Sequence, residues 1–186
     1  AEDLAVALLD SGQILGGHHV AFDWAVIAAQ FPRLLQRIFE AYEQDRIQDT
    51  GVRQKLIDLA NGELRGWHRQ PGQKPIKYGY ALGDTLKGPK QTPVAIGLAR
   101  RHFGIIMAKG ADTWRLHYGE LRNVPIPSWP AEAKKYAIDD AVIIPHLCAI
   151  QEKDAAVLVD QYRQTRTAFW VQLMSCWGMI TSPSAV

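Results

Sequence analysis

The sequence predicts an α/β fold, and three observations lead to that prediction. Short apolar runs alternate with longer segments of helical periodicity over the first 61 residues. Glycine, proline and capping residues stand at most of the changes between them. A hydrophobic fraction of 47% and a charged fraction of 22% are those of an ordinary globular protein. The alternation is typical of parallel strands joined by helices.

The first half of the chain divides into helices and short strands. The predicted helices cover residues 1–10, 24–31, 33–45 and 52–61, and the predicted strands fall within residues 13–22 and 46–50. Asp23 is expected to cap the helix at residues 24–31. Either Asp49 or Thr50 is expected to cap the helix at residues 52–61.

Residues 62–91 interrupt this rhythm. They contain six glycines and three prolines, so we expect a mobile loop or a hairpin around residues 76–82 rather than a linker between domains. Thr92 and Pro93 are a typical N-cap and first-turn pair. They predict a helix over residues 94–103 that ends at Gly104.

The last third is predicted to be mainly helical. A turn-rich stretch over residues 113–130 precedes a helix over residues 131–156, in which Pro145 is expected to cause a kink or a break. A final helix runs from about residue 160 and ends at Gly178. Its apolar stripe consists of Tyr162, Phe169, Leu173 and Trp177.

Charge is unevenly distributed along the chain. Residues 1–61 contain 5 Lys and Arg against 9 Asp and Glu, residues 62–123 contain 11 against 4, and residues 124–186 contain 5 against 6. An acidic segment next to a basic one suits an enzyme that binds a polyanion and cleaves it with cations. A solvated insertion that is rich in Lys and Arg would give the same pattern.

Several classes of protein are excluded or disfavoured. No apolar run approaches the roughly 18 residues that span a bilayer, so no membrane role is expected. Cys148 and Cys176 lack metal-ligand spacing and are expected to be buried, reduced thiols of a cytoplasmic protein. The phosphate-binding loop, the dinucleotide fingerprint and the nucleophile elbow are absent from the sequence.

Two stretches carry candidate catalytic residues. Tyr136 and Asp140 stand four residues apart in a predicted helix, so they lie on one face, one turn apart. A phenol beside a carboxylate can hold a water against a metal-bound phosphate. Upstream, GGHHVAFDWAVI places Asp23 after an apolar run. The simpler interpretation is that Asp23 is an N-cap, Tyr136 a half-buried aromatic and Asp140 a solubilising charge.

In this order, the two stretches resemble the second and third motifs of the 3′→5′ proofreading exonuclease domain of family A DNA polymerases. They match the tyrosine branch of the DEDD superfamily. Residues 48–60 and 110–141 are similar to further segments of such domains in phage-type polymerases, and similar stretches cover most of residues 4–178. The resemblance implies a ribonuclease H-like 3′→5′ exonuclease fold, with a mixed sheet flanked by helices.

The resemblance also implies a domain organisation. Residues 1–155 correspond to the exonuclease-like domain, whose first strands are expected upstream of the sequence, and residues 62–91 form a basic insertion in it. Residues 156–186 are similar to the start of the polymerase domain that follows in such enzymes. The chain is therefore expected to be truncated at both ends.

The implied chemistry is two-metal-ion hydrolysis of the 3′-terminal phosphodiester of single-stranded DNA, with two Mg²⁺ or Mn²⁺ ions in the complete site. Asp23 and Asp140 are implied as metal ligands, and Tyr136 as the residue that orients the attacking water. The Asp-x-Glu motif that supplies the other two carboxylates does not occur in the sequence. We therefore expect little or no nuclease activity from these 186 residues alone.

Other residues are candidates for contact with nucleic acid. His19 stands where the family usually has Asn, four residues before Asp23. His18 and His19 are not expected to bind a metal together, because adjacent residues of a strand point to opposite faces. The basic candidates for phosphate contact are Arg100, Arg101, Lys109 and Arg115. Trp114 and Tyr118 are candidates for base stacking, although core packing is the better explanation for both.

Two alternatives stay open. The first is a non-catalytic nucleic-acid-binding module that keeps the exonuclease fold; its DNA binding would weaken steeply with salt and would not depend on Mg²⁺. The second is a stand-alone RNA-trimming exonuclease of the same superfamily, against which the polymerase-like final helix argues.

Overall fold

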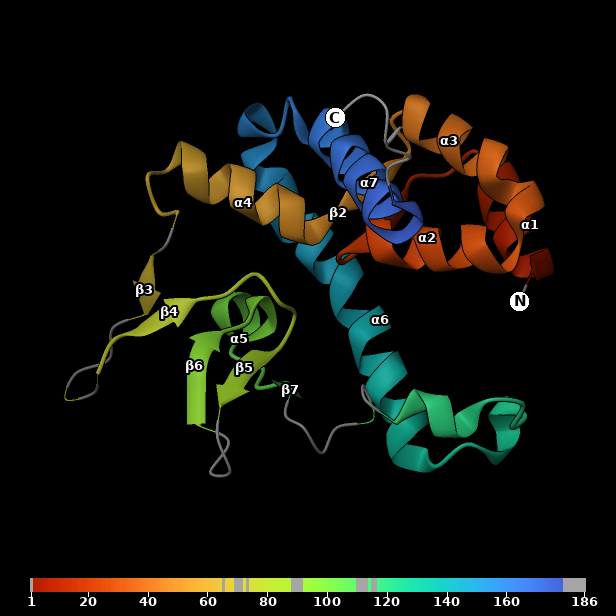
Figure 1. Cartoon of the computed structure of the whole chain (residues 1–186). Helices are drawn as coiled ribbons and strands as arrows, with labels where there is room; N and C mark the ends of the chain where they lie inside the picture. Colours follow the sequence, from red (N-terminus) through yellow and green to blue (C-terminus); the bar gives the residue numbers. More distant parts are fainter. Residues whose placement is uncertain are drawn as a thin grey trace, which may run out of the picture. The chain divides into compact units, whose positions relative to one another are not determined.

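The structure is a computed structural model that describes residues 2–64, 66–68, 72, 74–87, 92–109, 114 and 117–178. Figure 1 shows the helices and strands of the described chain, which divides into two units. Unit 1 consists of the described residues of 1–56 and 155–186, and unit 2 of those of 57–154.

Unit 1 contains a two-stranded parallel sheet and several helices. Strand β1 (Leu15–Gly17) pairs with β2 (Ile47–Asp49), with Gly17 opposite Asp49 at the carboxyl edge. The helical elements are α1 (Glu2–Asp10), α2 (Val20–Gln30), the 3-10 helix η1 (Pro32–Leu34), α3 (Leu35–Glu43), the first part of α4 (Thr50–Ala60) and α7 (Gln161–Trp177). The predicted helices of this unit are thus confirmed in outline.

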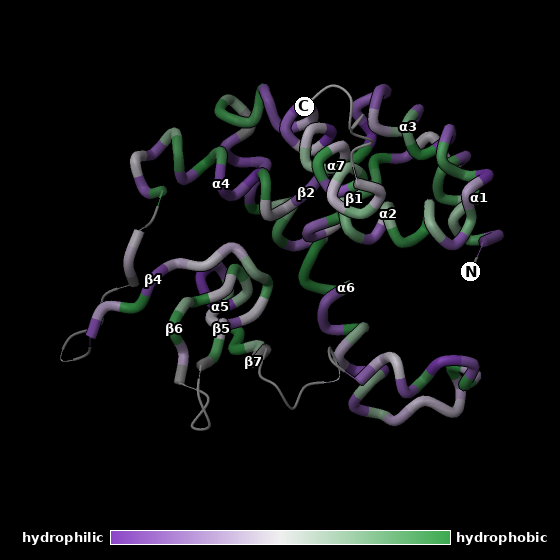
Figure 2. Tube along the Cα trace, in the orientation of Figure 1, coloured by the Kyte–Doolittle hydropathy of each residue, from purple (hydrophilic) through white to green (hydrophobic). Residues whose placement is uncertain are grey.

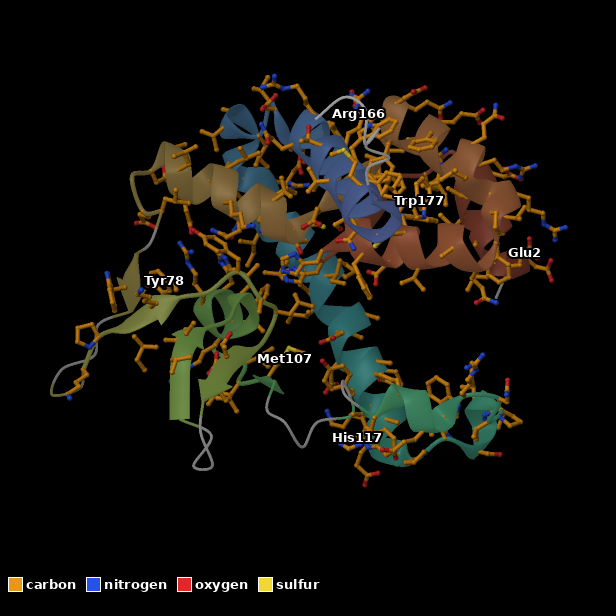
Figure 3. All side chains as sticks on the ribbon, viewed as in Figure 1. Glu2, Tyr78, Met107, His117, Arg166 and Trp177 are labelled. Carbon is orange, nitrogen blue, oxygen red and sulfur yellow. The ribbon has the colours of Figure 1, made fainter. Side chains whose placement is uncertain are left out.

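The core of unit 1 is built where α7 packs against α2, α3 and β2. Phe169 of α7 is fully buried and stacks on Tyr42 of α3, with ring centroids 4.5 Å apart and planes at 10°. Of the predicted apolar stripe, Phe169 and Leu173 are buried, whereas Trp177 is 58% exposed (Figure 3). Hydrophilic and hydrophobic residues alternate along α3 (Figure 2), as expected for a helix with one buried side.

The predicted start of the second helix is wrong. Helix α2 begins at Val20, three residues before Asp23, so Asp23 lies inside the first turn and is not the cap. The N-cap position is taken by His19, whose backbone is left-handed (φ 54°, ψ 39°) and whose side chain makes no capping hydrogen bond.

Unit 2 contains a five-stranded mixed sheet in the order β3-β4-β6-β5-β7. Its strands are β3 (Trp67–His68), β4 (Ile76–Tyr78), β5 (Asp84–Lys87), β6 (Thr92–Ile96) and β7 (Ala108–Lys109). The pairs β4–β6 and β5–β7 are parallel, and β3–β4 and β5–β6 are antiparallel. The helical elements are the end of α4, α5 (Leu98–Phe103), η3 (Tyr118–Leu121), η4 (Ile126–Ser128), α6 (Ala131–Gln151) and the first half of η5 (Glu152–Val157).

The helix predicted over residues 94–103 is wrong in its first part. Residues Thr92–Ile96 form β6, which pairs with both β4 and β5, and α5 begins only at Leu98. Pro93 is tolerated in this strand because it stands opposite Leu86, where the register of β5 and β6 shifts. Helix α5 does end at Gly104 as predicted, with a left-handed φ of 69°.

Gly97, which joins β6 to α5, allows a close approach to the backbone of Leu82 and Gly83. A Cβ atom there would lie 2.3 Å from the backbone of Gly83. Beside it, Leu82, Leu98 and Ala99 pack with Ile143 and Leu147 of α6 in the core of unit 2. Helix α6 runs from Ala131 to Gln151 without a break at Pro145.

The mixed α/β class is confirmed, with small sheets and mostly helical content. Among the described residues, no helix combines the length and apolar character needed to cross a membrane. Neither cysteine forms a disulfide. Cys148 is half-buried but Cys176 is exposed, so the expectation of two buried thiols is wrong for Cys176.

Candidate active site

Asp49 joins the starts of two helices at the carboxyl edge of the parallel sheet. Its side chain is buried, and Oδ2 accepts a hydrogen bond of 2.9 Å from the Val20 amide at the start of α2. Oδ1 accepts hydrogen bonds from the amides of Gly51 (2.8 Å) and Val52 (3.1 Å) at the start of α4. Of the two predicted caps of α4, Asp49 is therefore the residue that caps it.

Asp23 lies one turn into α2, and its side chain is exposed. The position near a helix N-terminus stabilises a negative charge. The pKa of Tyr42 is raised, first by burial of its hydroxyl and then by the charges of Asp49 and Asp23.

His18 and His19 lie side by side, contrary to the expectation from strand geometry. Strand β1 ends at Gly17, and the left-handed turn at His19 brings the two ring centroids to 4.4 Å in an edge-to-face arrangement. Nδ1 of His18 lies 2.8 Å from Oγ1 of Thr50. The expectation that the side chains of His18 and His19 point to opposite faces of a strand is therefore wrong. Within the described ranges, however, no three His, Cys, Asp or Glu side chains are grouped so as to hold a metal.

In unit 2, α6 places Tyr136 and Asp140 one turn apart on one face, as their spacing predicts. Both are half-buried. The ring centroid of Tyr118 lies 6.1 Å from that of Tyr136, and the Tyr118 hydroxyl donates a hydrogen bond of 3.0 Å to the carbonyl of Ala133. The pKa of Tyr118 is raised by burial and then by Tyr136 and Asp140. These three side chains therefore share one electrostatic environment.

The two adjacent aspartates of α6 have different surroundings. Asp139 forms an ion pair of 2.5 Å with Lys135, one turn earlier on the helix. Asp140, in contrast, influences Tyr118. The charge of Asp140 therefore acts on Tyr118, and Asp139, which is paired with Lys135 in the same turn of α6, is the neighbouring carboxylate for comparison.

A pocket of about 410 Å³ adjoins Tyr136. Its walls are aliphatic, from Met107 (Figure 3) and its two preceding isoleucines and from α6, and its polar groups are Lys135, Tyr136 and Asp139. This volume is within the range of small-molecule sites, roughly 300–1,000 Å³. Tyr136 and Asp139 therefore border this concave surface, whereas Asp140 is not among its lining residues.

Arg100 and Arg101, predicted to contact phosphates, form ion pairs inside unit 2. Arg101 donates to both carboxylate oxygens of Asp58, at 2.7 and 2.8 Å, and Arg100 donates to Asp84 at 2.9 Å. Asp58 and Asp84 are fully buried. The two guanidinium groups stabilise unit 2 through these ion pairs. Contact of Arg100 or Arg101 with phosphate stays a prediction, and a phosphate would have to compete with the carboxylates for them.

The remaining predicted contact residues give a mixed result. Arg115 and the side chain of Lys109 lie outside what the structure describes. Trp114 is half-buried and packs edge-to-face on His117, with ring centroids 6.0 Å apart. Both Trp114 and Tyr118 therefore have packing roles, and base stacking by either stays a prediction.

Sequence reasoning missed Trp67 on β3 and Lys77 on β4. The two residues are direct partners in the antiparallel register, and Trp67 is 48% exposed. A tryptophan within a segment rich in Lys and Arg is the sequence pattern that could have indicated them as contact residues for nucleic acid.

Asp23 belongs to unit 1, whereas Tyr136 and Asp140 belong to unit 2, and the structure defines each within its own unit. Comparison with protein-family models, with curated proteins and with solved structures found no significant match. The assignment of Asp23 and Asp140 as metal ligands stays a prediction.

Proposed function

We propose that this chain is part of a 3′→5′ exonuclease of the tyrosine branch of the DEDD superfamily, with a ribonuclease H-like fold, from a family A-like DNA polymerase. The observation that carries the proposal is the Tyr136–Asp140 pair on one face of α6, beside Tyr118. The single-stranded 3′ end of DNA is the substrate of such an enzyme. The uneven charge of the chain, basic between two acidic segments, is compatible with that substrate.

The reaction breaks the bond between phosphorus and the 3′ oxygen as a water attacks the phosphorus. Tyr136 orients that water through its hydroxyl, and packing against Tyr118 holds the Tyr136 ring in place. Asp23 and Asp140 offer carboxylate oxygens, the donors that Mg²⁺ and Mn²⁺ prefer. When bound, such ions neutralise the phosphate and stabilise the leaving oxygen.

Asp23 and Asp140 have the type of donor atom that these cations prefer, but two carboxylates are fewer than the four of a complete site. Asp23 is exposed and Asp140 is half-buried, so both suit hard cations. They supply only two of the four carboxylates, since the sequence contains no Asp-x-Glu. We therefore expect the chain alone to bind single-stranded DNA without trimming it appreciably.

A gel assay on a 5′-labelled single-stranded oligonucleotide tests the proposal. The chain alone should leave the oligonucleotide intact in the presence of Mg²⁺. The protein that is translated with the codons upstream of Ala1, where an Asp-x-Glu strand is expected, should shorten it from the 3′ end one nucleotide at a time.

Variants of that longer protein assign the residues. Asp23→Asn and Asp140→Asn should each abolish shortening, whereas Asp139→Asn, which alters the carboxylate paired with Lys135, should keep most of it. Equal shortening by all three variants would refute the assignment. DNA binding that is independent of Mg²⁺, without shortening by any form of the protein, would instead support the non-catalytic binding module.

A further inference from the structure

The β3–β4 ribbon carries an aromatic ring and an ammonium group on one face. Trp67 stands directly opposite Lys77 in the antiparallel register, so their side chains point to the same side. Nζ of Lys77 lies 5.3 Å from the centroid of the Trp67 ring. Both side chains are exposed, Trp67 to 48%. A large aromatic side chain is thus presented to solvent next to a positive charge.

The opposite face of the ribbon is the packed one. Tyr78, which follows Lys77 on β4 (Figure 3), points to that face because side chains alternate along a strand. The guanidinium of Arg101 lies 4.3 Å from the centroid of its ring. Gly66 allows this packing, since a Cβ there would lie 2.9 Å from Cδ2 of Tyr78. The face with Trp67 and Lys77 is therefore left available to a ligand.

The charge of the segment favours an anionic ligand. Residues 62–91 contain six Lys and Arg against two Asp and Glu. Both acidic residues form ion pairs with arginines of α5: Glu63 with Arg101 at 3.2 Å, and Asp84 with Arg100 at 2.9 Å. Both carboxylates of the segment are thus paired with arginines that lie outside it.

We infer that Trp67 and Lys77 form a platform for single-stranded DNA, in which Trp67 stacks on a base and Lys77 contacts a phosphate. The choice of ligand rests on the proposed function. An exposed aromatic ring next to a cation is the arrangement that binds single strands without sequence preference. Bases in a duplex already stack on each other, so the platform should prefer single strands. It lies in the basic insertion and is separate in sequence from Asp23, Tyr136 and Asp140.

Fluorescence anisotropy of a labelled twelve-nucleotide poly(dT), titrated with the full chain in EDTA, tests the platform. Trp67→Ala should weaken binding roughly tenfold, and Trp67→Phe should keep most of the affinity because the ring remains. Trp177→Ala is the matched control, since it removes a tryptophan that is 58% exposed in unit 1, and it should leave the affinity within about twofold. Lys77→Ala should lower the slope of log affinity against log salt by about one.

The outcomes separate this inference from the proposed function. Equal affinity of Trp67→Ala and the unchanged chain, with equal circular dichroism, overturns the platform and leaves the exonuclease proposal standing. Preference for duplex over single-stranded DNA also overturns the platform. Binding that depends on Trp67, together with no excision by the longer protein, supports the platform and refutes the exonuclease.

Discussion

The carboxylate of Asp49 accepts a hydrogen bond of 2.9 Å from the amide of Val20, which lies 29 residues earlier in the chain. This bond fixes the start of α2, the helix that carries Asp23. Val20, whose amide donates this bond, directly follows His19, a non-glycine residue with a left-handed backbone. Such a conformation costs free energy and needs support from its surroundings. Asp49 is therefore a positioning residue for the exposed carboxylate of Asp23.

Replacing Asp49 by Ala should lower the free energy of unfolding by about 2–4 kcal/mol, because two helices lose their cap and three amides lose an acceptor. Chemical denaturation measures the change. Asp3→Ala, at an exposed position on α1, is the control and should change the free energy by less than about 0.5 kcal/mol. Equal stability of the two variants would contradict the capping role.

Phe169→Ala should destabilise unit 1 by about 3–5 kcal/mol, because it removes a fully buried ring that stacks on Tyr42. Val171→Ala, two residues along α7 and 54% exposed, should change stability by less than about 0.5 kcal/mol. Denaturation curves of the two variants test whether α7 is an integral part of the unit formed by the first 56 residues. If Phe169→Ala changes the free energy of unfolding as little as Val171→Ala does, α7 is not needed for the stability of unit 1.

Arg101→Ala should cost about 3 kcal/mol of stability, because it leaves the buried carboxylate of Asp58 without its bidentate partner. Arg33→Ala breaks an ion pair with Glu2 in which the arginine is largely exposed to solvent, and it should cost much less stability than Arg101→Ala. Thermal melts of both variants provide the comparison. If Arg101→Ala weakens DNA binding but leaves stability unchanged, the structural role of Arg101 is wrong.

His102 gives unit 2 a dependence on pH. Burial, and then the charge of Arg101, hold the pKa of His102 below its ordinary value of 6.5, against the opposite effects of Asp58 and Asp154. The unfolded chain then takes up a proton at a higher pH than the folded chain does. The contribution to stability is full above 6.5 and is lost as pH falls through the lowered folded pKa.

His102→Gln removes this titration. The variant should therefore lose less stability than the unchanged chain between about pH 7 and pH 5, as measured by melting temperature. An identical loss in both proteins would show that His102 does not contribute.

Local pattern predicted the elements whose stabilising contacts are local. Apolar periodicity predicts four of the helices, α1, α3, α4 and α7. Glycines with a positive φ stand just after three of these helices, at positions 12, 62 and 178. The strand β6 was missed because Thr92 and Pro93 have the chemistry of a helix start. What decides the conformation there is pairing with β4 and β5, which no local pattern contains.

The candidate site shows the same limit. The spacing of Tyr136 and Asp140 was sufficient to place them on one helix face, because helix geometry alone determines it. The roles of Arg100 and Arg101 were not predictable, since their partners Asp84 and Asp58 lie 16 and 43 residues away. The true cap of α2 was missed for the same reason, because Asp49 reaches it across the sheet.

The assignment of Asp23 and Asp140 as cation ligands is tested most directly on the isotope-labelled longer protein, in which the expected Asp-x-Glu strand completes the four carboxylates. The test is a Mn²⁺ titration with a short single-stranded DNA, followed by paramagnetic broadening of the amide signals. We predict selective broadening around Asp23 and around Asp140, lost at α6 in Asp140→Asn and retained in Asp139→Asn. Broadening with no preference for either carboxylate, or broadening at α6 that persists in Asp140→Asn, would contradict the assignment.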